Sequence, residues 1–111
     1  MSRYATRGRI WRYAGQSGWY FVTLSARVSA QIRTQRGAVR SAWGSVRVIA
    51  VVGKTSWKTS VFPDSKSGRY VLPLKERVRA AEGLHSGDVV RLVITSDLHG
   101  PLSASSKRVP T

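Results

Sequence analysis

The stretch "SGRYVLPLKERVRA" at residues 67–80 is a near-copy of "SGWYFVTLSARVSA" at residues 17–30, fifty residues earlier. Aligned without gaps, the two stretches are identical at seven of fourteen positions, too many for chance in a chain of varied composition. Such internal self-similarity indicates a duplicated structural unit. The fold should therefore consist of two equivalent halves.

Each copy begins with a strand pattern. The runs "WYFVTL" (19–24) and "RYVLPL" (69–74) are rich in aromatic and branched apolar residues, as buried strands are. Pro73 falls at the junction with the next element, where a missing N–H is tolerated. Further strand patterns precede and follow the copies, at 7–13, 45–52, 55–62 and 88–95.

Each copy continues as a helix, expected over 26–36 in the first half and over 75–82 in the second. Ser25 is a suitable N-cap residue for the first helix. Gly37 and Gly83 are suited to ending the two helices. The residues expected on the inner helix faces are Val28, Ile32, Val78 and Ala81.

The repeated unit is therefore strand, turn, strand, helix, strand. Neither half can bury its apolar face alone, and closure of the two halves on each other removes exposed strand edges. We expect an all-β fold with two short helices, a closed six-stranded, double-psi-like β-barrel with a helix at each end. Residues 1–96 should form this single domain, and the polar segment 97–111 should be a flexible tail.

The chain resembles the domain-of-unknown-function family DUF 1905. The resemblance lies in "GWYFVTLS", "WGSVRV", "TSWKTSVFPDSKSGRYVLPLKERVRAAEG" and "GDVVRLVI", which cover most of residues 8–95. It implies a small closed barrel similar to double-psi barrels and no established reaction. Members are often joined to a C-terminal domain of a bacteriocin-protection (OmpD-associated) family, and we expect that domain to be absent here.

A weaker likeness concerns "LPLKERVRAAEGLHSGDVVRLVI" (72–94). It is similar to the half-barrel of AbrB-type transition-state regulators, which dimerise through swapped hairpins and bind DNA. In this chain both halves are present, so the likeness implies the fold rather than the function.

The charge is the most informative feature for function. The formal net charge is +14, and the first carboxylate of the chain is Asp64. Such a field favours association with polyanions, most simply nucleic acid, although a GC-rich genome also raises arginine content. The expected polyanion-binding residues are Arg33, Arg36, Arg40 and Arg47, on one solvent-facing patch; a solvated helix end is the alternative.

A small-ligand site is the second hypothesis. The turn between Phe62 and Tyr70 should help to form the barrel mouth, where small barrels place ligands. Its backbone N–H groups and Lys66 could hold a small anion, although Pro, Asp, Ser and Gly are also what a tight turn requires. The candidate ligand-binding residues are Trp43, Arg47, Asp64, Ser65, Lys66, Ser67 and Tyr70.

Aromatic rings alternate with arginines in "RGRIWRYAGQSGWYF" (7–21). Exposed rings can stack on bases, and arginine binds phosphate in a bidentate manner. Strands also need aromatic side chains to fill a barrel. We therefore expect most of these rings in the core, with at most two of them exposed.

Catalysis has little support in the sequence. There is no cysteine, and His85 shares a tight turn with Ser86 and Asp88, where triad geometry is rare. No paired carboxylates, phosphate-binding glycine motif or metal-ligand spacing is present. We expect a non-enzymatic cytoplasmic binding module with no cofactor or metal and no membrane association, whose oligomeric state is open.

Overall fold

The computed structural model describes residues 3–15, 18–35 and 44–96. Six strands and two helices follow one another in the order that the duplication predicts. They are β1 (Arg3–Arg12), β2 (Tyr20–Thr23), α1 (Ala26–Gln35), β3 (Val46–Val52), β4 (Thr55–Asp64), β5 (Arg69–Pro73), α2 (Glu76–Glu82) and β6 (Val89–Ser96).

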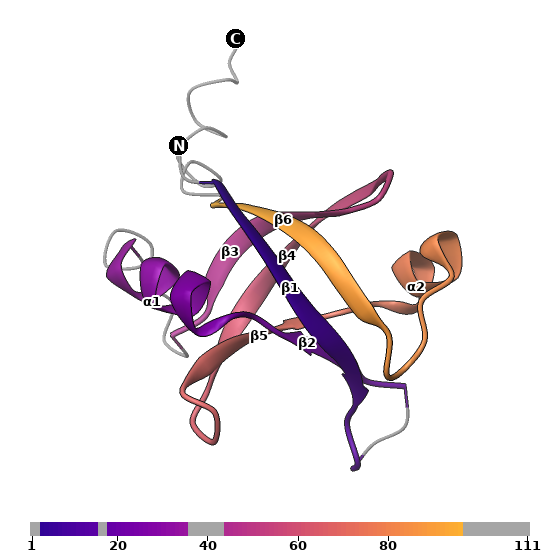
Figure 1. Cartoon of the computed structure of the whole chain (residues 1–111), viewed down its shortest axis with the longest axis horizontal. Coiled ribbons are helices and arrows are strands. Elements are labelled where there is room, and N and C mark those ends of the chain that lie inside the picture. Colours follow the sequence, from indigo (N-terminus) through magenta and orange to yellow (C-terminus); the bar gives the residue numbers. More distant parts are fainter. Residues whose placement is uncertain (1–2, 16–17, 36–43, 97–111) are drawn as a thin grey trace, which may run out of the picture.

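The strands form a closed barrel in the order β1-β2-β5-β4-β3-β6, with every neighbouring pair antiparallel (Figure 1). Closure leaves no unpaired strand edge in this sheet. The predicted all-β class, the six-stranded closed barrel and the two helices are confirmed. The double-psi crossing of the connections stays a prediction.

The barrel has an internal pseudo-twofold relationship at an offset of fifty residues. Strands β2 and β5 pair so that Val22 faces its own equivalent, Leu72. On one side of this pair Leu24 N donates to Tyr70 O at 2.9 Å, and on the other Leu74 N donates to Tyr20 O at 2.8 Å. A shift of fifty residues converts each of these hydrogen bonds into the other, since Leu24 corresponds to Leu74 and Tyr20 to Tyr70. This symmetry confirms the duplication.

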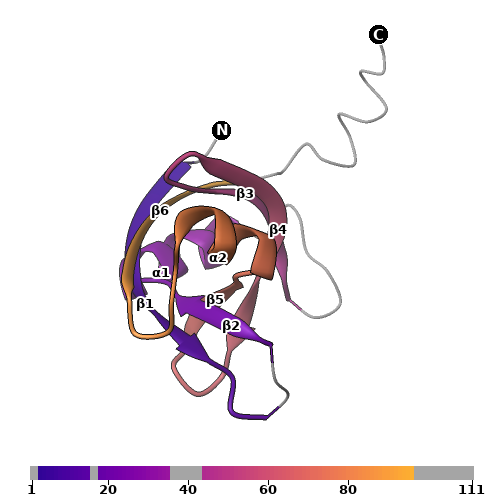
Figure 2. The same ribbon diagram turned by 90° about the vertical axis from the view of Figure 1, so that its right-hand side faces the viewer.

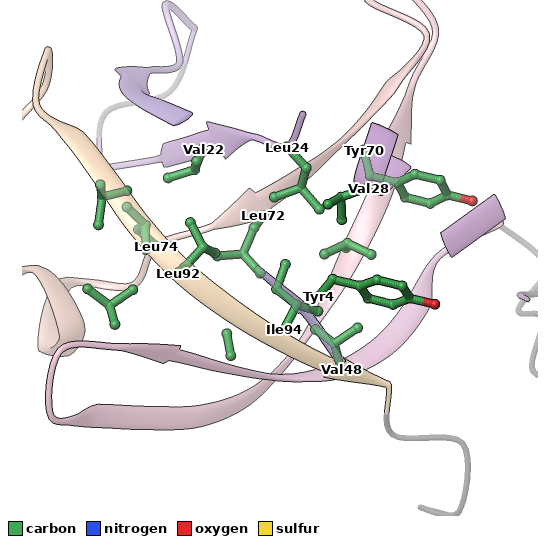
Figure 3. Packing of buried hydrophobic residues seen from close by; sticks show 14 of the residues in the cluster. Tyr4, Val22, Leu24, Val28, Val48, Tyr70, Leu72, Leu74, Leu92 and Ile94 are labelled. Atoms are coloured by element: carbon green, nitrogen blue, oxygen red, sulfur yellow. The ribbon is translucent and has the colours of Figure 1, made fainter. Parts of the chain in front are cut away.

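Alternating side chains of the strands fill the barrel. In β3 the buried residues are Val46, Val48, Ala50 and Val52, at every second position. Figure 3 shows Val22 and Leu72 among the core residues, with the rings of Tyr4 and Tyr70 extending toward the same side. Val28, Ile32 and Val78, which we predicted on the inner helix faces, are buried, and so are Trp57 and Leu74.

The helices lie at opposite ends of the barrel, as Figure 1 and the turned view in Figure 2 both show. Ser25 caps α1 as predicted, because its Oγ accepts a hydrogen bond from Val28 N at 3.2 Å. Gly83 ends α2 in the left-handed conformation, with φ of 64°. The prediction for Ala81 was wrong: Ala81 is exposed, because the chain turns at Gly83 and packs Leu84 against the core instead.

Strand β1 begins at Arg3, four residues before the predicted start. Residues 3–9 of the strand pair with nearly the whole of β6, from Arg3↔Thr95 to Arg9↔Val89, and this pairing extends the strand beyond its own apolar pattern. The predicted positions of Gly37 and of the tail 97–111 lie outside the described residues. In the described part of the chain, neither helix has the length and apolar character that crossing a membrane would require.

Candidate functional site

Four aromatic side chains gather on the outside of the barrel, where β1 and β2 form a hairpin. Close to the hairpin, Ile10 of β1 and Val22 of β2 point into the core, and the neighbouring Trp11 and Phe21 point outward. The prediction that most of these rings fill the core was therefore wrong, because they lie in the outward register. The limit of two exposed rings is confirmed: Tyr13 and Trp19 are 48% and 52% exposed.

The rings pack against one another around Phe21. The ring centroids of Trp11 and Phe21 are 5.0 Å apart, and Trp19 stacks on Phe21 at 5.9 Å with an interplanar angle of 14°. Tyr13 meets Phe21 edge-on at 6.4 Å. Trp11 Nε1 donates to Thr23 Oγ1 at 2.9 Å, which fixes the indole. The cluster is thus a preformed aromatic surface.

These rings line a groove of about 380 Å³, which we call the aromatic groove. It extends from the β1–β2 hairpin across to the β4–β5 hairpin. Its lining residues are Trp11, Tyr13, Trp19, Phe21, Pro63, Asp64 and Val71. Such a volume, lined mainly by apolar side chains with one carboxylate, is typical of a small-molecule or single-base site.

A second hollow of about 420 Å³ lies on the other side of Trp19, and we call it the basic pocket. It is lined by Gly18, Trp19, Tyr20, Thr59, Pro73, Leu74, Lys75, Glu76 and Arg79. Arg79 Nε donates to Leu74 O at 3.2 Å, and the guanidinium Cζ is 3.8 Å from the centroid of the Tyr20 ring. Two contacts hold the cation in place, and the hydrogen bond uses only the Nε donor of the guanidinium.

Trp19 connects the two hollows. It lines both the aromatic groove and the basic pocket, and about half of its surface is exposed. A ligand stacked on this indole would have apolar rings on one side and the cations of Lys75 and Arg79 on the other. An aromatic ring that carries an anionic group would match this arrangement.

The candidate site coincides with the positions at which the two copies differ. Trp19 stands where the second copy has Arg69, and Phe21 where it has Val71. Lys75 and Arg79 stand where the first copy has Ser25 and Ser29. The first half therefore supplies the rings, and the second half supplies the cations.

The residues predicted at the barrel mouth, between Phe62 and Tyr70, form a tight turn. Asp64 Oδ2 accepts hydrogen bonds from Ser67 Oγ at 2.8 Å and Ser67 N at 3.3 Å, and Arg69 N donates to Ser67 Oγ at 3.2 Å. Ser65 and Lys66 are exposed at the tip. Asp64 is the member of this set that lines the aromatic groove, whereas Tyr70 is buried in the core with 1% of its surface exposed.

The predicted arginine patch is only partly within the described residues. Arg33 Nη2 donates to Gly68 O at 2.6 Å, and its Cζ is 5.7 Å from the centroid of the Tyr70 ring. Arg47 is exposed on β3. Trp43, Arg36 and Arg40 lie outside the described residues, so the continuous patch stays a prediction.

Lys75 and Arg79 were missed by sequence reasoning, and so was the outward register of the rings. Two signals in the sequence could have found them. The first is the set of differences between the copies, since a symmetric fold does not require them. The second is the alternation in β1, which places Arg3, Arg7 and Arg9 in register with Trp11 on the outward face.

In the turn that contains His85, the side chain of Asp88 stabilises the backbone. Asp88 Oδ2 accepts a hydrogen bond from His85 N at 2.8 Å and lies 3.7 Å from His85 Nδ1. The His85 side chain is 81% exposed. Among the described residues, no three His, Asp or Glu side chains are grouped so that they could hold a metal ion.

These features define a small, internally duplicated closed barrel that carries its candidate site on the outer surface. The family model "Domain of unknown function (DUF1905)" matches residues 7–94, and the chain belongs to this family. The match extends from the middle of β1 to Ile94 in β6 and includes both hairpins. A search of curated proteins found no match.

Proposed function

We propose that this protein is a non-enzymatic binding module that binds single-stranded nucleic acid on its outer surface. The observation that carries the proposal is the position of Trp19, half-exposed between the aromatic groove and the basic pocket. A nucleotide consists of a planar base joined to an anionic phosphate. The aromatic groove would hold the base, and the basic pocket would hold the phosphate. A cytoplasmic location accords with a cysteine-free chain.

Stacking on Trp19 would supply affinity without sequence preference. Stacking of a base on an aromatic side chain contributes about 1–3 kcal/mol per base, and it requires a base freed from its duplex. Phe21 supports the indole from behind through the stacked contact at 5.9 Å, so the platform exists before a ligand arrives. These properties favour a single strand over a duplex.

Arg79 and Lys75 would supply contacts to phosphate. The guanidinium presents a planar set of N–H donors that suits two phosphate oxygens at once. The net charge of +14 would raise the rate of encounter with a polyanion at low salt. Glu76 lies in the same pocket, so the local field is less positive than that of the chain as a whole.

A small ligand in the aromatic groove is the second candidate function. Asp64 places a carboxylate in this groove, at the turn between Phe62 and Tyr70 that the sequence indicated. The volume of about 380 Å³ lies within the range of small-molecule sites. Binding of such a ligand would depend little on salt, whereas binding of a polyanion would weaken steeply as salt increases.

The test is fluorescence anisotropy with labelled 12-nucleotide single strands of DNA and RNA, a matched duplex, and a salt series. We expect the single strands to bind more tightly than the duplex and Trp19→Ala to weaken binding by roughly tenfold or more, as loss of one stacking contact implies. Phe62→Ala is the control, because Phe62 is 40% exposed but lines neither hollow. Absence of binding at about 50 mM salt, where phosphate contacts are strong, would refute the proposal.

A further inference from the structure

The outward face of β1 leads from the aromatic groove to a second cluster of cations. Side chains of this strand alternate between the core and the solvent, and Tyr4, Thr6 and Ile10 are buried. The outward positions include the arginines Arg3, Arg7 and Arg9 and then, at the groove, Trp11. The strand thus carries a line of cations that ends at the aromatic rings.

Arg7 faces another arginine directly across the sheet. It pairs with Arg91 of β6, and both side chains are exposed. Like charges in directly opposite positions of antiparallel strands repel each other and destabilise the sheet. Neither side chain has an ion pair or a hydrogen bond with the described residues. The fold tolerates this repulsion without neutralising it locally.

The two arginines line a hollow of about 420 Å³ together with Ala5, Thr6 and Ser25, and none of these described lining residues is a carboxylate. Thr6 is 5% exposed, and its Oγ1 accepts a hydrogen bond from Ser25 N at 3.1 Å. The hollow therefore lies beside two exposed arginines, and paired guanidinium groups suit a phosphate oxyanion.

We infer that the pair Arg7 and Arg91 binds a backbone phosphate of the same strand whose bases stack at the aromatic groove. This inference rests on the proposed function and adds the path of the ligand, along the outer face of β1. Arg3 and Trp11 are eight residues apart, which corresponds to about 26 Å along a strand. A site of this length fits the roughly 4–16 nucleotides that small barrels bind.

Oligonucleotide length tests the path. A 3-nucleotide strand covers the aromatic groove and the basic pocket, whereas a 12-nucleotide strand also reaches Arg7. For the longer strand, the double variant Arg7→Gln/Arg91→Gln should reduce the log–log salt slope by about 0.7, the contribution of the one phosphate that the pair contacts on a single strand. Binding of the shorter strand should be unchanged.

The control variant Lys58→Gln/Arg77→Gln removes two charges at exposed positions that line none of the three hollows. It should leave the slope within about 0.3 of the unmodified protein, because it removes no phosphate contact. Circular dichroism establishes that both double variants are folded. If the Arg7 and Arg91 variant keeps the full slope with the 12-nucleotide strand, or loses no more than the control, the path is wrong and the proposed function stands. If the unmodified protein binds neither length, the proposed function fails, and this inference fails with it.

Discussion

Arg79 of α2 lies over the ring of Tyr20 in β2, with its Cζ 3.8 Å from the ring centroid. The same relationship occurs in the other half, where Arg33 of α1 lies 5.7 Å from the centroid of the Tyr70 ring. In both cases a helix places its arginine on the tyrosine of the opposite copy. The two arginines differ in their other contacts, because Arg33 also donates a hydrogen bond to Gly68 O, whereas Arg79 lines the basic pocket.

Arg79→Gln should weaken binding of a single strand and have little effect on stability. The substitution removes the cation that we place on the phosphate, and it also removes a cation–π contact worth about 0.5–1 kcal/mol at a partly exposed site. We expect the salt slope to fall by about 0.7, the contribution of one phosphate contact. The matched control is Arg77→Gln, an exposed arginine of the same helix that lines neither hollow. Equal effects of the two substitutions would show that only net charge matters.

Trp57→Ala should be strongly destabilising. The side chain is 5% exposed and belongs to the core cluster, and truncation of a large buried aromatic residue costs about 3–5 kcal/mol. Urea denaturation followed by circular dichroism measures the change in the free energy of unfolding. Phe62→Ala, on the exposed side of the same strand, should cost less than about 1 kcal/mol. A small loss for Trp57→Ala would contradict its place in the core.

Ser29→Ala should reveal the polar link between α1 and β5. Ser29 is 1% exposed, and its Oγ accepts a hydrogen bond from Tyr70 N at 3.0 Å. Alanine would leave this buried N–H without a partner, which costs about 1–3 kcal/mol. Thr34→Ala is the control, because Thr34 is exposed and its hydroxyl only donates to Ala30 O within the helix. Amide hydrogen exchange at Tyr70 should rise in the Ser29 variant and stay unchanged in the control.

Arg91→Glu should stabilise the protein while it weakens binding. The substitution converts the repulsive pair with Arg7 into an attractive one, and opposite charges across a sheet contribute about 0.2–1 kcal/mol. The thermal midpoint should rise, and the salt slope for a 12-nucleotide strand should fall. A variant that is less stable than the unmodified protein would show that Arg7 and Arg91 do not repel each other. The expected combination would mean that the pair is kept for binding at a cost in stability.

The architecture of the barrel could be predicted from the amino-acid sequence alone. The repeat at an offset of fifty residues, together with alternating apolar positions, was sufficient to predict six strands, two helices and a closed barrel, because burial and strand closure leave few other arrangements. The caps at Ser25 and Gly83 were equally local and were predicted correctly. The predicted burial of Ala81 was wrong, because the position of the chain after α2 depends on how Leu84 packs against the core.

The location of the candidate site could not be predicted from the sequence, because it depends on how the whole barrel folds. Trp19 and Arg79 are sixty residues apart in the chain, and they become neighbours because β2 pairs with β5 and α2 packs at the end of the barrel next to Tyr20. Arg7 and Arg91 likewise meet through the register of β1 against β6. A local pattern gives the face on which a side chain lies. Which distant side chain stands beside it is set by strand order and register, and these follow from packing of the whole barrel.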